Sequence, residues 1–229
     1  MTDLTLELKT FLTRNNDALV GVGDLSGLPG LAFRYGISLA MPRPAAVVAG
    51  IMEGPTAEYF QAYHELEQRL TETALRGEEF LKARGYQAYA RISARVREDG
   101  EWRTELPHKT VATAAGLGWI GKSCLLVTKE YGSAVRLTSI LTDAPLDCDE
   151  PIRESKCGGC QKCVEACPAG ALSGATWTVG LDRDALLNKE ACCSKQIELT
   201  KKNTGLESEF LCGKCFAVCP YTQRYLKGF

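Results

Sequence analysis

The chain has little charge imbalance, few histidines and no long hydrophobic run. Its 27 Lys and Arg nearly balance 28 Asp and Glu, and the formal net charge of −1 gives no general attraction to nucleic acid or anionic membrane. The longest apolar run, Pro44 to Ile51, is too short to span a bilayer. The first residues carry neither a basic patch nor a hydrophobic segment of signal length. These absences predict a cytoplasmic protein that does not enter membranes.

Low-complexity and repeat architectures are also excluded. Gly and Pro account for 22 and 9 of the 229 residues, close to the average for globular proteins. No self-similar segment recurs at a period of about 20 to 50 residues. The length suits one large domain, or a main domain with a small appended one.

Cysteine is the residue in excess. The chain has 11 cysteines, an odd total that weakens a disulfide framework. In a reducing compartment, dense cysteine indicates metal binding. Only Cys124 and Cys148 lie outside the last third of the chain. The other cysteines are Cys157, Cys160, Cys163, Cys167, Cys192, Cys193, Cys212, Cys215 and Cys219.

The first two thirds of the sequence alternate between helical and strand patterns. Apolar residues recur every three to four positions in the longest of the expected helices, which Gly85 ends. Helices are expected over residues 4–15, 56–84 and 106–115, and strands over 17–24, 36–41, 86–96, 125–128 and 134–142. The uneven order favours an α+β domain over regular βαβ repetition. An acidic, proline-bounded stretch over 143–151 marks its end.

The run from Cys157 to Pro168 has the spacing C-x2-C-x2-C-x3-C-P, which is that of bacterial ferredoxins. Three cysteines on a tight loop can direct three thiolates at one iron–sulfur cubane. In two-cluster ferredoxins the fourth cysteine of this run binds the other cluster. The run therefore predicts a second cysteine motif elsewhere in the chain.

That second motif runs from Cys212 to Pro220, with the spacing C-x2-C-x3-C-P. By the same crossing rule, one 4Fe-4S cluster would be held by Cys157, Cys160, Cys163 and Cys219. The other would be held by Cys167, Cys212, Cys215 and one cysteine of the adjacent pair Cys192-Cys193. Neighbouring side chains rarely both reach one small cluster, so one ligand and one bystander are expected, and the local sequence does not choose between them.

Zinc is the alternative metal. Structural zinc sites use pairs of C-x2-C or mixtures of cysteine and histidine, and the only histidines, His64 and His108, lie outside this region. The region from Pro151 onward carries 11 Lys and Arg against 8 Asp and Glu. A cubane with four thiolates has about two net negative charges, which such lysines offset.

From these patterns together we expect an α+β fold with an N-terminal mixed α/β domain (residues 1–147) carrying a sheet of the cofactor-pocket type. A ferredoxin-like two-cluster domain (148–229) follows it.

A glycine-rich segment, Gly116 to Ser123, matches both G-x-G-x-x-G and the phosphate-loop pattern. Both motifs need a strand before and a helix after them, whereas here a helical stretch precedes and a strand follows. Nucleotide binding is therefore not expected. The remaining interpretation is a turn whose backbone approaches a cofactor, or only the packed chain, with Gly116, Gly118, Trp119, Gly121 and Lys122 as the candidate cofactor-binding residues.

Together with the cysteine run, the segments Val111–Lys122, Leu125–Val127 and Glu130–Ser133 resemble epoxyqueuosine reductases and, more distantly, reductive dehalogenases. The resemblance covers roughly residues 86–221. It implies cobalamin and two 4Fe-4S clusters as cofactors and removal of an epoxide oxygen from a modified tRNA base. It also favours Cys192 over Cys193, since an isolated cysteine followed after one residue by serine is a ligand in that family.

Two departures from the family pattern bear on function. The family's proton-donating aspartate has no clear match, which leaves Glu105 and His108 as candidate catalytic proton donors. The family's C-terminal helical repeat domain, which helps to hold tRNA, has no counterpart before Phe229, ten residues after Cys219. A tRNA substrate is therefore doubtful.

Two functional hypotheses follow. In the first, an external donor such as a ferredoxin or flavodoxin reduces the clusters. They feed electrons to a cofactor in the N-terminal domain, with cobalamin expected and flavin as the other option. In the second, the chain is an electron-transfer protein that has no substrate chemistry of its own and reduces a corrinoid or flavin partner enzyme. The sequence does not decide whether the chain is itself an enzyme, or its oligomeric state.

Overall fold

The computed structural model describes residues 2–207 and 209–228. The chain divides into two compact units whose segments alternate along the sequence. The sheet unit comprises Met1–Pro42, Leu66–Gly118 and Arg136–Ile152. The cysteine unit comprises Arg43–Glu65, Trp119–Val135 and Arg153–Phe229.

This division differs from the single boundary between residues 147 and 148 that the sequence suggested. Segments 43–65 and 119–135 group with the cysteines because they supply much of that unit's apolar core. Val48, Ile51 and Tyr59 are buried against Phe216 and Ala217. The cysteine-rich region, whose residues serve mainly loops and thiols, is thus completed by apolar side chains from earlier in the chain.

A four-stranded sheet in the order β1-β2-β6-β3 forms the sheet unit. Its strands are β1 (Leu19–Asp24), β2 (Tyr35–Pro42), β6 (Val135–Thr142) and β3 (Ala88–Ala90). β1 pairs antiparallel with β2, with Leu19 opposite Ala40, and β3 pairs antiparallel with β6, with Ala88 opposite Thr142. The expected α+β fold class is confirmed.

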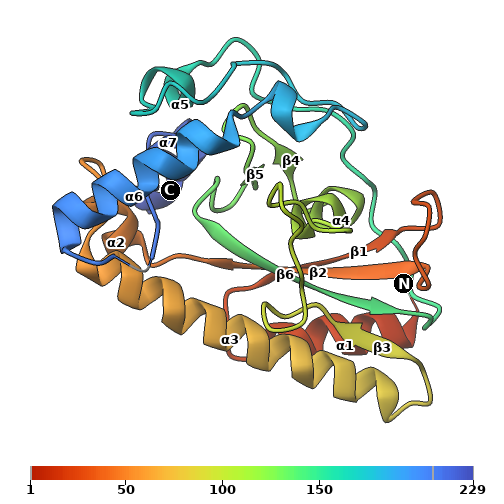
Figure 1. Cartoon of the computed structure of the whole chain (residues 1–229). Helices are drawn as coiled ribbons and strands as arrows, with labels where there is room; N and C mark the ends of the chain where they lie inside the picture. Colours follow the sequence, from red (N-terminus) through yellow and green to blue (C-terminus); the bar gives the residue numbers. More distant parts are fainter. Residues whose placement is uncertain (1, 208, 229) are drawn as a thin grey trace. The chain divides into compact units, whose positions relative to one another are not determined.

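Helices cover the two faces of this sheet (Figure 1). Side chains of α1 (Asp3–Thr13) and of the later part of α3 (Ala57–Lys82) pack with Ile140 on one face. The next residue, Leu141, packs with Val111 of α4 (His108–Ala114) on the other face. Successive residues of β6 therefore point to opposite sides, as strand geometry requires.

Glycines in β1 let α4 lie close to the sheet. A Cβ atom on Gly21 would come within 2.2 Å of the Ala115 carbonyl oxygen, and one on Gly23 within 2.8 Å of the Ala114 carbonyl carbon. Any larger residue would push the end of α4 away from β1. The close approach fixes where the chain leaves α4 and begins the glycine-rich segment.

Most expected elements are present, but the strand expected over 86–96 was too long. Only Ala88–Ala90 forms β3. The Ala90 N–H donates to the buried carboxylate of Glu78 at 2.7 Å, and the backbone N–H groups of Arg95 and Val96 turn back to the Ile92 carbonyl. The Arg91 N–H still donates to the Ser139 carbonyl of β6 at 2.8 Å, and the turn after it ends the pairing.

Short helices and a hairpin make up the cysteine unit. The hairpin pairs β4 (Trp119–Ile120) with β5 (Leu126–Val127). The helices are α2 (Ala45–Gly50), the first part of α3, α5 (Lys162–Glu165), a 3₁₀ turn at Arg183–Ala185, α6 (Lys189–Thr204), α7 (Lys214–Ala217) and α8 (Pro220–Leu226). Among the described residues, no helix is both long and apolar enough to cross a membrane.

Candidate metal centre

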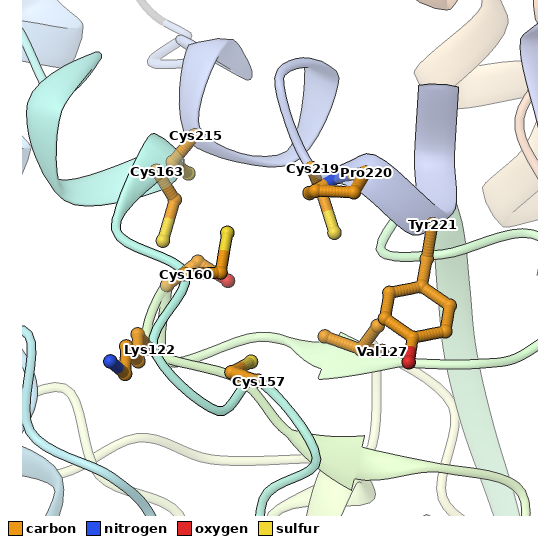
Figure 2. Close-up of a pocket in the computed structure, with 11 residues that line it drawn as sticks. Lys122, Val127, Cys157, Cys160, Cys163, Cys215, Cys219, Pro220 and Tyr221 are labelled. Carbon is orange, nitrogen blue, oxygen red and sulfur yellow. The ribbon is translucent and has the colours of Figure 1, made fainter. Parts of the chain in front are cut away.

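Cysteines from both sequence motifs line one cavity in the cysteine unit. Figure 2 shows Cys157, Cys160 and Cys163 of the first motif facing Cys219 of the second, with Cys215 also at the edge. The other lining residues are Gly121, Lys122, Ser123, Val127, Pro220 and Tyr221. The structure therefore brings together the four cysteines that the crossing rule places on one cluster.

Left-handed glycines and proline shape the loops that carry these cysteines. Gly158 has φ +54° and lies inside a turn in which the Cys160 N–H donates to the Cys157 carbonyl at 3.1 Å. Gly213, with φ +85°, precedes α7, and Pro220 begins α8 directly after Cys219. Glycine adopts positive φ without strain, and proline suits the first turn of a helix.

The first cysteine set has the chemistry that an iron–sulfur cluster needs. Burial and, after it, the neighbouring thiols of Cys157, Cys219 and Cys160 together raise the pKa of Cys163 to about 11. Four thiolates in one cavity repel one another unless a cation holds them, and iron supplies that charge. Among the described residues, no three His, Cys, Asp or Glu side chains lie close enough together to hold a single metal ion. A cubane instead needs thiolates spread around it, because each iron takes its own cysteine.

The remaining cysteines of the two motifs form a second group. Burial raises the pKa of Cys212, and Cys192 and Cys167 are the neighbouring thiols that raise it further. Burial also raises the pKa of Cys215, and its neighbours are Cys212, Cys192, Cys163 and Cys167. Cys215 is therefore the residue close to both groups. The assignment of individual ligands stays a prediction.

Hydrogen bonds reach several sulfur atoms of this second group, including one from the Lys214 backbone to Cys212. The Ala171 N–H donates to Cys167 Sγ at 3.4 Å, and Gln196 Nε2 donates to Cys192 Sγ at 3.1 Å. Gln196 lies four residues after Cys192 on α6, so it shares that cysteine's helix face. The sequence analysis missed Gln196, although the helical spacing from Cys192 was available as a signal.

The candidate cofactor-binding residues of the glycine segment lie in different places. Gly116 has φ +70°, and a Cβ there would come within 2.6 Å of the Glu150 carbonyl oxygen. Gly118 is buried just before β4. Trp119 is buried, and its ring meets Tyr221 edge-on with centroids 4.9 Å apart. Gly121 and Lys122 border the cysteine cavity. No helix follows them, because β5 does, as expected from the sequence.

The two candidate proton donors lie on either side of Pro107, in different environments. Glu105 is exposed in the bend before α4. His108 begins α4 and is partly buried, with Nδ1 2.6 Å from Ser139 Oγ on β6. Burial lowers the pKa of His108 to about 4, Arg91 and Arg136 lower it too, and Glu67 opposes them. At neutral pH the imidazole is therefore uncharged and is a weak acid.

His108 is expected to make the fold less stable as the pH falls. Its folded-state pKa of about 4 lies below the ordinary 6.5, so the unfolded chain takes up the proton first. This stabilisation is complete above pH 6.5 and is lost towards pH 4, by about 2 kcal/mol between roughly pH 7.5 and 5. The non-titrating variant His108→Asn lacks this loss. Anaerobic denaturant unfolding of both proteins measures it, and a stability difference that is independent of pH would contradict the assignment.

Comparison with known proteins agrees with this geometry. Residues 156–222 match the family model of the 4Fe-4S double cluster binding domain. An epoxyqueuosine reductase of Listeria monocytogenes is 36% identical over 128 residues, which cover 52% of this chain and 30% of that protein. One from Aliivibrio fischeri is 28% identical over 197 residues, or 79% of this chain and 47% of that protein. The chain resembles the epoxyqueuosine reductases. The chain spans less than half the length of these two relatives.

Solved structures share the fold. An epoxyqueuosine reductase solved with a tRNA stem loop matches with a TM-score of 0.64 at 23% identity, covering 96% of this chain and 65% of that one. A catabolic reductive dehalogenase matches with a TM-score of 0.69 at 19% identity, covering 89% and 30%. The doubt about a tRNA substrate finds no support among the relatives, one of which was solved with a tRNA stem loop. The double-cluster match supports an iron–sulfur domain over residues 156–222.

Proposed function

We propose that the chain is an iron–sulfur redox protein with two 4Fe-4S clusters that pass electrons to a corrinoid bound by the sheet unit, for epoxyqueuosine-reductase-like chemistry. The observation that carries the proposal is the meeting of Cys157, Cys160 and Cys163 with Cys219 in one cavity. Cys167, Cys192, Cys212 and Cys215 would hold the second cluster. Because Cys215 is close to both groups, the two clusters would lie near enough for electrons to pass between them.

The residues of the chain would have separate tasks in this reaction. The eight cysteines hold the clusters, which accept single electrons from an external donor such as a ferredoxin or flavodoxin. Cobalamin, when bound, supplies low-valent cobalt for the reductive step. Glu105, exposed before α4, would donate the proton. His108 is less suited, because burial lowers its pKa to about 4 and leaves it uncharged at neutral pH.

The contacts that the structure gives for the glycine segment are with the polypeptide, and its role in cofactor binding stays a prediction. Gly116 packs on the Glu150 carbonyl, Trp119 packs on Tyr221, and Gly121 and Lys122 face the cysteine cavity. Support for cobalamin comes instead from the fold, which is shared with a reductive dehalogenase whose structure suggests a B12-dependent mechanism, at a TM-score of 0.67 and 19% identity. Flavin is the other cofactor to test.

A second candidate function is electron transfer without substrate chemistry, in which the partner enzyme holds the corrinoid or flavin. The neutral state of His108 favours it, because one of the two candidate acids is then a poor proton donor at neutral pH. The two functions differ in whether this chain itself binds the acceptor cofactor.

Anaerobic reconstitution followed by cob(II)alamin titration separates the two functions. We expect about eight irons per chain and a change in the electron paramagnetic resonance (EPR) spectrum of cob(II)alamin upon mixing. An unchanged cobalt spectrum with full iron content would reject the corrinoid proposal and favour electron transfer alone. The same titration with flavin, followed by its absorbance, tests the remaining cofactor.

A further inference from the structure

Lys122 is a buried lysine without a counter-charge. Its side chain lies in the turn between β4 and β5, and the residue is 4% exposed. Within residues 2–207 and 209–228 it makes no hydrogen bond or ion pair. Lysine is rarely buried unless it is paired, because removing an ammonium group from water is unfavourable. Its ammonium nitrogen is not among the fully buried polar atoms that lack a partner, so it keeps slight contact with water, and its charge is only partly screened.

The cavity beside Lys122 is where a negative charge would be. Lys122 lines the same cavity as Cys157, Cys160, Cys163 and Cys219 (Figure 2). The preceding residue also approaches the sulfur atoms, since a Cβ on Gly121 would lie 3.5 Å from Cys157 Sγ. None of the described residues that line the cavity is acidic. The lysine of a phosphate-loop pattern thus borders cysteine sulfurs.

We propose that Lys122 sets the reduction potential of the cluster held by Cys157, Cys160, Cys163 and Cys219. The inference rests on the ligand assignment proposed above. A cubane with four thiolates carries about two negative charges, and one more when it accepts an electron. A positive charge nearby stabilises the reduced form more than the oxidised form. Burial strengthens the effect because less water screens the charge.

Lys156 provides a matched comparison. It directly precedes the proposed ligand Cys157 but is exposed, with its ammonium 6.0 Å from the centre of the Trp119 ring. Water and salt screen an exposed charge, so its effect on the cluster should be small. Burial rather than closeness in sequence is the property that distinguishes Lys122 from Lys156.

The experiment is an anaerobic redox titration of the protein with both clusters present, followed by EPR. In Lys122→Met, the equilibrium constant for reduction of one cluster should fall at least tenfold, which is about 59 mV for one electron. The other cluster should keep its potential. Lys122→Arg and Lys156→Met should both titrate like the wild type. Gln196→Leu, which removes the hydrogen bond to Cys192 Sγ, should lower only the second potential and so identify that cluster.

The outcomes separate this inference from the function on which it rests. If Lys122→Met keeps about eight irons with unchanged potentials, or if Lys156→Met shifts a potential equally, the role of Lys122 is overturned. If Lys122→Met loses a cluster, Lys122→Gln is titrated instead. Cluster loss in both neutral variants would also overturn the inference, since Lys122 would then serve assembly. A wild-type protein that forms no clusters would instead overturn the proposed function.

Discussion

Replacing Cys192 by alanine should halve the iron content of the protein, from about eight to about four irons per chain. Cys192 is a neighbouring thiol of both Cys212 and Cys215, and Cys167 neighbours all three. A cubane held by four cysteines loses one corner in this variant. The expected result is loss of the second cluster alone, measured by iron analysis and by EPR spin counting after reduction.

Cys193→Ala is the matched control, because Cys193 is the next residue on the same helix. Successive side chains of an α-helix point about 100° apart, so the two thiols cannot occupy the same ligand position on a cluster. Only Cys192 has the hydrogen bond from Gln196 and neighbours both Cys167 and Cys212. Cys193→Ala should therefore keep about eight irons. Equal iron loss in the two variants would contradict the division into one ligand and one bystander.

The cysteine pattern could be read from the sequence because its constraints are mostly local. The spacing of Cys157, Cys160 and Cys163 limits how far the thiols can separate, and the crossing rule then selects Cys219. The structure indeed places these four at one cavity. The choice of Cys192 needed a family resemblance, since two adjacent cysteines have the same local sequence.

The boundaries of the compact units could not be predicted in the same way. Periodicity shows that Tyr59 and Leu66 share a buried helix face, but it does not say what covers that face. In the structure Tyr59 packs with Phe216 in the cysteine unit, whereas Leu66 packs with Ile140 in the sheet unit. One continuous helix thus contributes to two cores, and only long-range contacts reveal it.

The glycine segment shows how context decides the meaning of a motif. Its sequence matches two nucleotide-binding patterns, and the order of the flanking elements, which the structure confirms, argues against both. The cofactor role expected for Lys122 stays a prediction, and the structure places this residue at the border of the cysteine cavity. Burial of a lysine cannot be inferred from its neighbours in sequence, since Lys122 and Lys156 look equally solvated there.

Gly132→Ala should destabilise the cysteine unit strongly. Gly132 has φ +59°, and a Cβ there would come within 2.1 Å of the Thr222 backbone nitrogen and 2.5 Å of Thr222 Oγ1. Thr222 is fully buried in α8, and its hydroxyl accepts a hydrogen bond from the Ser133 N–H at 3.0 Å. The backbone cannot yield as a flexible side chain would. Overpacking and left-handed strain together should cost about 3 kcal/mol or more.

The damage should reach the first cluster, because α8 begins directly after Cys219, a proposed ligand. Displacing α8 would move Cys219 relative to Cys157, Cys160 and Cys163, so iron content should fall along with the melting temperature. For a chain of this size, 3 kcal/mol corresponds to a drop of about 6 to 12 °C. Gly205→Ala isolates the backbone strain, since Gly205 has φ +73° but no atom within 4 Å of its added Cβ. Its cost should be about 1 kcal/mol, with iron unchanged. If the two variants melt together and both keep their iron, the contact between Gly132 and Thr222 does not position Cys219.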